Sequence, residues 1–210
     1  MTEDRGPASG PLKAACAELQ EARDRVTEWT ERLAGERRTV SGIETSMGEA
    51  ALTAGDAGEI ASRLAEARAA EDVTEAALEQ AMYEVVHARG AVIAGRIAEL
   101  YAEAAALNAD ADQHHARTLE LLAQLSEWED GAVFVAVEPW MLELKGASLG
   151  GCRIPKTTRL RNQAAGLLAR ADKLERQAAA ATDDQHAALA DRIAAEATRD
   201  TSTDTATAAA

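Results

Sequence analysis

Two short segments of the sequence pair a carboxylate with a histidine at the spacing that metal ligands use on helices. Glu84 precedes His87 by three residues, and Asp112 precedes His115 by the same interval. Bundles that hold two iron ions need two such elements facing each other. The two segments are 28 residues apart on what reads as one helix, roughly 42 Å of rise, so they cannot share a metal within one chain. The sequence therefore predicts no metal site.

A glycine-rich stretch before a lysine and a threonine suggests a second chemistry, the binding of phosphate groups. Gly151 precedes Lys156 and Thr157, where a helix is expected to begin. In a phosphate-binding loop the lysine directly follows the last glycine, because both must reach the same phosphates. Four residues including Pro155 intervene here. We therefore expect no nucleotide hydrolysis and, since no local motif resembles a catalytic triad, no catalytic residue, no cofactor and no enzyme activity.

Basic residues gather between residues 153 and 176, which hold seven Lys or Arg and two acids. The whole chain has a formal charge of −14. An acidic body repels nucleic acid and anionic membranes, whereas a local basic patch can bind an acidic protein surface. We expect a protein partner and no membrane contact. Local nucleic-acid contact through Arg153–Arg176 is the alternative function. A third interpretation pairs these arginines with acids on a neighbouring helix, the candidates being Glu120, Glu127 and Glu129.

Residues 130–156 hold aromatic and apolar side chains that could anchor a partner. Residues 132–137 read as a buried strand and residues 140–144 as a half-exposed one, although Pro139 could instead begin a short helix. A two-stranded hairpin is marginal alone and must pack on helix ends or another chain. A simple connector that reverses the chain is the plainer interpretation. The expected partner-binding residues are Phe134, Trp140, Met141, Arg153, Lys156, Arg159 and Arg161.

Long helices must position these segments. Phe, Trp and Tyr make up only 3% of the residues, so the side chains that fill a thick core are scarce. An excess of Ala with Glu, Arg and Leu is typical of helices packed along narrow seams. The expected fold is mainly α: an elongated antiparallel coiled-coil or helical-hairpin rod with a very long central helix and a small β-like or irregular insert at 131–156.

Seven-residue spacing and capping signals set the expected boundaries. Thr182 and Gln185 form a capping box that predicts a helix break. The expected segments are a flexible N-terminus at 1–10, a first helix at 11–50 that bends or breaks near its glycines, a long central helix at 56–129, a hairpin-like head at 130–156, C-terminal helices at 157–199 with a break near 182, and a disordered tail at 200–210.

The apolar stripes predict which helices pair. The first helix is expected to fold back on the front half of the central helix, with Val26 near Met82. The C-terminal helix is expected to fold back on the rear half, with Leu160 opposite Leu125. The first helix is expected to bury Leu12, Leu19, Val26, Leu33, Val40 and Met47, with Ala15, Ala22, Trp29 and Ile43. The expected row of the central helix is Ile60, Leu64, Leu78, Met82, Val86, Ile93, Ile97, Leu100, Ala104, Leu107, Ala111, Leu121, Leu125 and Trp128. That of the C-terminal helix is Leu160, Ala164, Leu167, Ala171, Leu174 and Ala178.

Narrow seams of this kind often need a further chain, so a homo-oligomer is expected. The sequence has no basic-then-apolar signal region and no run of roughly 18 apolar residues, which predicts a cytoplasmic protein. Cys16 and Cys152 are too few for a disulfide framework and are expected to be reduced.

Overall fold

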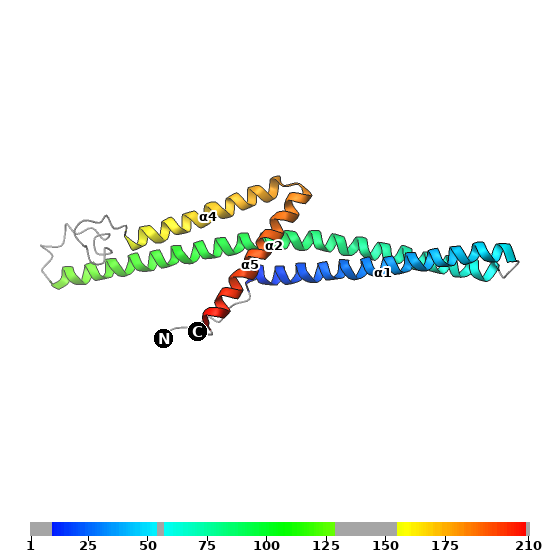
Figure 1. Ribbon diagram of the computed structural model, residues 1–210. Helices are drawn as coiled ribbons and strands as arrows, with labels where there is room; N and C mark the ends of the chain where they lie inside the picture. Colours follow the sequence, from blue (N-terminus) through cyan, green and yellow to red (C-terminus); the bar gives the residue numbers. More distant parts are fainter. Residues whose placement is uncertain (1–9, 54–56, 129–154, 209–210) are drawn as a thin grey trace. The chain divides into compact units, whose positions relative to one another are not determined.

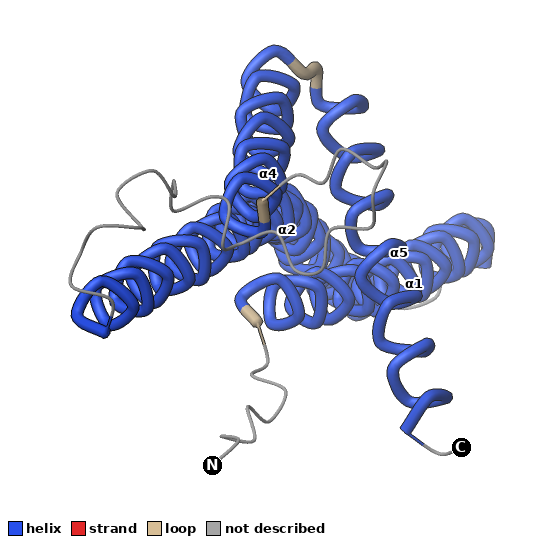
Figure 2. The backbone as a smooth tube through the Cα atoms, turned by 90° about the vertical axis from the view of Figure 1, so that its left-hand side faces the viewer, coloured by secondary structure: helices blue, strands red, loops and turns tan. Residues whose placement is uncertain are grey.

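A computed structural model describes residues 10–53, 57–128 and 155–208, and nearly all of these residues are helical (Figures 1 and 2). The helices are α1 (Pro11–Thr53), α2 (Ala57–Trp128), α4 (Lys156–Ala180) and α5 (Asp183–Ala208). The mainly α prediction is confirmed for these ranges. The insert expected at 131–156 lies outside them except for its last two residues. The chain forms two compact units, residues 1–94 with 182–210 and residues 95–181, and their boundary falls within α2.

Helix α1 begins at a proline and continues through three glycines. Pro11 takes the first helical position, where its fixed φ suits the helix and no amide proton is needed. The Gly10 carbonyl accepts hydrogen bonds from the amides of Lys13 at 2.9 Å and Ala14 at 3.3 Å. The helix has no break among residues 35–48, and α1 extends to Thr53. A glycine costs a helix about 1 kcal/mol, which packing along a long seam can outweigh.

In the first unit, α1 lies antiparallel to residues 57–94 of α2 (Figure 1). The order of the ion pairs along the two helices fixes this direction, because residues late in α1 meet residues early in α2. The register agrees with the predicted neighbourhood of Val26 and Met82. The pairs are Arg25–Glu84 at 2.9 Å, Arg37–Glu71 at 3.1 Å, Arg37–Glu75 at 3.3 Å and Arg68–Glu44 at 2.8 Å.

The seam of the first unit is made largely by the expected α1 residues. Leu12, Leu19, Leu33 and Val40 are buried and Val26 is half-buried. Met47 is 37% exposed, so the prediction that it lines the seam is wrong. Val40 packs with Leu64, Ala67 and Ile43 in one apolar cluster. On α2, however, the face that meets α1 is one position away from the predicted stripe: Ala81 and Val85 are buried, whereas Met82 and Val86 are exposed. Thr74 is also buried there, and its hydroxyl donates to the Ala70 carbonyl at 2.9 Å. The prediction that Met82 and Val86 line the seam is therefore wrong.

In the second unit, α4 lies beside residues 95–128 of α2 (Figure 1). The buried face of α4 is the predicted one, comprising Thr157, Leu160, Ala164, Ala171 and Leu174. On α2, Leu100, Ala104 and Ala111 are buried as expected. Leu121 is exposed, and the buried position near it is Thr118, whose hydroxyl donates to the His114 carbonyl at 2.9 Å. The interpretation of Leu121 as a seam residue is wrong.

Polar contacts fix the alignment of α4 with α2. Tyr101 bonds Asp172 at 3.1 Å, and Arg161 bonds Asp112 at 3.0 Å. Leu160 is therefore level with the helical turn that follows Asp112, about three turns before Leu125. The predicted pairing of Leu160 with Leu125 is wrong. The same alignment sets Ala104 level with Ala171 and Ala111 level with Ala164, and all four alanines are buried.

Helix α4 ends at Ala180 and α5 begins at Asp183. The Thr182 amide donates to Gln185 Oε1 at 3.1 Å, and the Thr182 carbonyl accepts from the His186 amide at 2.8 Å. The first of these bonds is one half of the predicted capping box, and the second is the first main-chain hydrogen bond of α5. In the first unit, Asp191 of α5 forms an ion pair with Arg23 of α1. The sequence predicts a disordered tail from residue 200, but helix α5 continues to Ala208. The reason is that Ala favours helix even without an apolar stripe.

Candidate functional site

The expected partner-binding residues fall in two places. Phe134, Trp140, Met141 and Arg153 lie outside the described residues. Lys156, Arg159 and Arg161 lie in the first two turns of α4, and all three are exposed. No side chain caps the start of α4, where the Pro155 carbonyl accepts from the Arg159 amide at 2.9 Å.

Arg161 differs from its two neighbours because it has an acidic partner. Its guanidinium bonds Asp112 Oδ1 at 3.0 Å, and both side chains are exposed. The partner differs from the expected set Glu120, Glu127 and Glu129, because α4 is aligned further toward the start of α2 than predicted. An exposed pair of this kind contributes roughly 0–1 kcal/mol. Arg161 is therefore engaged within the chain, although weakly.

A row of cations runs along one side of α4. Arg159, Arg170 and Lys173 are separated by 11 and 3 residues, which brings them to the same side of a helix with 3.6 residues per turn. Lys156 begins the row, and Gln163 and Gln177 fill positions between and beyond its cations. All six side chains are exposed. We call Lys156, Arg159, Arg170 and Lys173 the basic row, and no acid occupies this side of α4.

The basic row has no acidic partner among residues 10–53, 57–128 and 155–208. By contrast, five acid–base pairs join helices among the described residues of the first unit, four made by arginines of α1 and one by an arginine of α2. Those cations hold the fold together and are less available for another molecule. The arginines with acidic partners on other helices are Arg23, Arg25, Arg37, Arg68 and, in the second unit, Arg161.

The two acids of α4 lie on its other side and are bound by α2. The Tyr101 hydroxyl donates toward Asp172 Oδ1 at 3.1 Å and Glu175 Oε1 at 3.2 Å. The pKa of Tyr101 is raised to about 12, chiefly by the hydrogen bond to Asp172. Desolvation, the hydrogen bond to Glu175 and the charge of both carboxylates act in the same direction. The acids of α4 are thus directed toward α2, and the basic row is left without neutralising charge on its own helix.

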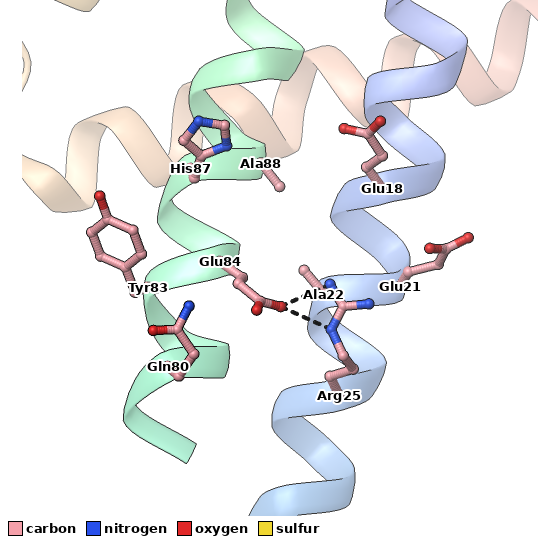
Figure 3. A pocket seen from close by; sticks show the side chains of 9 residues that line it. All are labelled: Glu18, Glu21, Ala22, Arg25, Gln80, Tyr83, Glu84, His87 and Ala88. Carbon is pink, nitrogen blue, oxygen red and sulfur yellow. Dashed lines mark hydrogen bonds and ion pairs between the residues drawn. The ribbon is translucent and has the colours of Figure 1, made fainter. Parts of the chain in front are cut away.

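Within the first unit, a pocket of about 270 Å³ lies between α1 and α2 (Figure 3). Glu18 and Glu21 border it from α1, and Tyr83 and His87 from α2. The Arg25–Glu84 ion pair crosses one end of it. The sequence suggests Glu84 and His87 only as metal ligands and gives no sign of the pocket, because its two walls are more than 50 residues apart in the chain. The antiparallel register of α1 and α2 was the signal that could have found it.

The chemistry of this pocket is that of an open, acidic groove. Its lining has three glutamates and one arginine, and Glu84 is already paired with Arg25. Across the described ranges, no group of three His, Cys, Asp or Glu side chains is arranged to hold a metal ion. Glu18 and Glu21 are exposed, whereas Glu84 is half-buried.

Comparison with known proteins gives no relative: no protein-family model matches the chain, and no curated protein or solved structure is significantly similar to it. None of the helices in the described ranges has a stretch long and apolar enough to cross a membrane.

Proposed function

We propose that this chain is a non-catalytic structural, scaffolding or adaptor protein that binds an acidic protein surface through residues 130–176. The single observation that carries the proposal is the basic row of α4, which is exposed and lacks acidic partners within the described ranges. Arg159, Arg170 and Lys173 span roughly 21 Å along the helix, about the reach of a three- to four-turn acidic helix laid beside it.

Electrostatics favours a protein partner over a polyanion. The remainder of the chain is strongly acidic, since the formal charge is −14 in spite of the basic segment. Nucleic acid presents phosphate charge over a long distance and would be repelled by that remainder, whereas an acidic patch on a protein can be confined to the basic row. Apolar side chains next to such a row would add specificity, and Phe134, Trp140 and Met141 are our candidates.

The helical framework supports a positioning role. We propose that α1 with the front of α2, and α4 with the rear of α2, pair as antiparallel coiled coils. The support is the seven-residue recurrence of buried residues, such as Leu12 with Leu19, Leu33 with Val40, Ala104 with Ala111 and Ala164 with Ala171. Such pairs hold a binding row at a fixed place on a stiff element.

Site-specific photo-crosslinking in the native host cells tests the proposal. A photoreactive amino acid at Gln163 lies within the basic row, and the same group at exposed Gln113 of α2 is the matched control. We expect Gln163, and not Gln113, to crosslink to acid-rich peptides of a protein. Crosslinks to nucleic acid would support the alternative of a regulatory protein that contacts nucleic acid, and equal labelling at both positions would contradict both functions.

Charge reversal provides the second arm. Replacing Arg170 and Lys173 by Glu should abolish the Gln163 crosslink, since the row would repel an acidic surface. The control is Arg192→Glu on α5, an exposed arginine without an ion pair among the described residues. Unchanged crosslinking in the doubly reversed variant would rule out the basic row as the contact.

A further inference from the structure

Helix α2 exposes two large apolar side chains on a face that neither α1 nor α5 covers. Met82 is 56% exposed and Val86 is 58% exposed. They are four residues apart and therefore neighbours on one side of the helix. Tyr83, 67% exposed, borders them. Contiguous apolar surface of this kind usually marks an interaction site.

The charges at the two ends of this face are opposite in sign. Glu79 comes three residues before Met82, and Arg89 comes three residues after Val86. In a seam with seven-residue spacing, Glu79 shares its position with Val86, and Arg89 shares its position with Met82. The order Glu79, Met82, Val86, Arg89 is therefore acid, apolar, apolar, base along a single row.

Neither charge forms an ion pair with another described residue. Glu79 is exposed and makes no ion pair within the described residues. The Arg89 Nε is buried and has no hydrogen-bond partner there. One turn earlier the situation is different, because Glu75 is bound by Arg37 at 3.3 Å. At the other end Ile93 is buried. The exposed part of the row is thus residues 79–86, and half-buried Arg89 ends it.

We propose that a second copy of this chain docks antiparallel on this face of α2. A two-fold axis level with residue 84 sets Met82 against Val86 of the second copy and Glu79 against Arg89 of the second copy. Each contact occurs twice, because a two-fold interface uses the same surface on both chains. The row is complementary to itself only when reversed, which is why the occupant is a second copy in the antiparallel direction.

The length of the face sets the strength of this contact. Residues 79–89 span roughly 15 Å, about three turns. The area that two such short faces bury is below the roughly 1,000 Å² of a specific, stable interface. The dimer is therefore expected to be weak, with a dissociation constant on the order of micromolar to millimolar. This contact is separate from the basic row of α4, and either proposal can fail alone.

Sedimentation velocity of the full chain between about 5 and 500 μM tests the dimer, since that range brackets the expected dissociation constants. The wild type should change from monomer to dimer with concentration. Val86→Glu should weaken association at least about tenfold, equivalent to about 1.4 kcal/mol. The matched control is Val73→Glu: Val73 is 70% exposed but lies two and a half turns before Met82, on the opposite side of α2. This control should stay within about twofold of the wild type.

Charge exchange tests the direction of pairing. Glu79→Arg alone should weaken the dimer, because two arginines would then meet in each outer layer. Combining it with Arg89→Glu should restore association. If the Arg89→Glu chain does not fold, as judged by circular dichroism, the Glu79→Arg and Val86→Glu results still decide. A wild type that is monomeric throughout, or association that is equal in Val86→Glu and Val73→Glu, would overturn the proposal.

Discussion

Tyr101 of α2 donates a hydrogen bond to Asp172 of α4 at 3.1 Å and thereby joins the two helices of the second unit. Glu175 lies one turn further along α4 and also reaches the same hydroxyl, at 3.2 Å. A phenol between two carboxylates is held in its protonated form. The pKa of Tyr101 is accordingly raised from 10.0 to about 12, chiefly by the bond to Asp172.

The first prediction concerns the stability of Tyr101→Phe as a function of pH. The folded-state pKa of Tyr101 is above its unfolded value, so its stabilising contribution is complete below pH 10 and is lost as the pH rises toward about 12. Urea unfolding should show the wild type to be more stable than Tyr101→Phe at pH 8, with the difference shrinking between pH 10 and 12. A difference that does not change across that range would contradict the assignment. Lysine titration affects both proteins equally and cancels in the comparison.

The second prediction concerns the alanine layers between α2 and α4. Ala111 and Ala164 are buried and level with each other, so Ala111→Leu inserts a larger side chain where two helices are close. We expect a loss of about 1–3 kcal/mol in the free energy of unfolding. Exposed Ala105 supplies the control, and Ala105→Leu should change stability by less than about 0.5 kcal/mol. If the two variants are equally stable, α2 and α4 do not meet at Ala111.

The third prediction concerns two leucines, Leu19 and Leu121, that the sequence predicts to be buried alike and that differ in exposure in the structure. Leu19 is fully buried in the first unit, whereas Leu121 is exposed. Leu19→Ala should cost about 2–5 kcal/mol, because it removes buried apolar area and leaves a cavity. Leu121→Ala should cost less than about 1 kcal/mol. Chemical denaturation of both variants measures the free energy of unfolding. A loss of more than about 2 kcal/mol for Leu121→Ala would mean that Leu121 is buried in the seam after all.

The fourth prediction concerns the buried hydroxyl of Thr74. Its acceptor, the Ala70 carbonyl, also lies four residues before the Thr74 amide, so removing the hydroxyl does not leave that carbonyl unpaired. Thr74→Val should therefore be neutral or stabilise the protein by up to about 1 kcal/mol. Thr27→Val removes an equivalent bond, to Arg23, at an exposed position and should have almost no effect. Destabilisation of Thr74→Val by more than about 1 kcal/mol would mean that its hydroxyl has a further role.

Burial could be predicted from the sequence where large apolar residues recur every seven positions. Leu12, Leu19, Leu33 and Val40 of α1 are buried as expected, whereas Met47, the last member of the same recurrence, is 37% exposed. The pattern fails in α2, where Thr74 and Thr118 take seam positions and Met82, Val86 and Leu121 do not. A threonine can enter a seam because its hydroxyl bonds a carbonyl of its own helix, a compensation that hydrophobicity patterns do not register.

The candidate sites were less predictable than the helices. Arg159 lies about 100° around α4 from Leu160, and Lys156, four residues before Leu160, is exposed at the first position of the helix. The pairing of Arg161 with Asp112 depends on how α4 is aligned with α2. The sequence does not determine this alignment, because the repeated Leu and Ala layers fit more than one. The pocket beside Glu84 depends on residues of α1 that are close only after the hairpin forms.

The alternation of leucine and alanine between α2 and α4 has a mechanical consequence. The layers repeat every seven residues, so displacing α4 by seven residues would again set Leu107 against Leu174 and Ala111 against Ala171. The apolar surface therefore resists such sliding only weakly. The hydrogen bond of Tyr101 with Asp172 favours the observed alignment, and the exposed pair of Arg161 with Asp112 adds a small contribution. Weakening both contacts would allow α4 to shift along α2 by seven residues, about two helical turns.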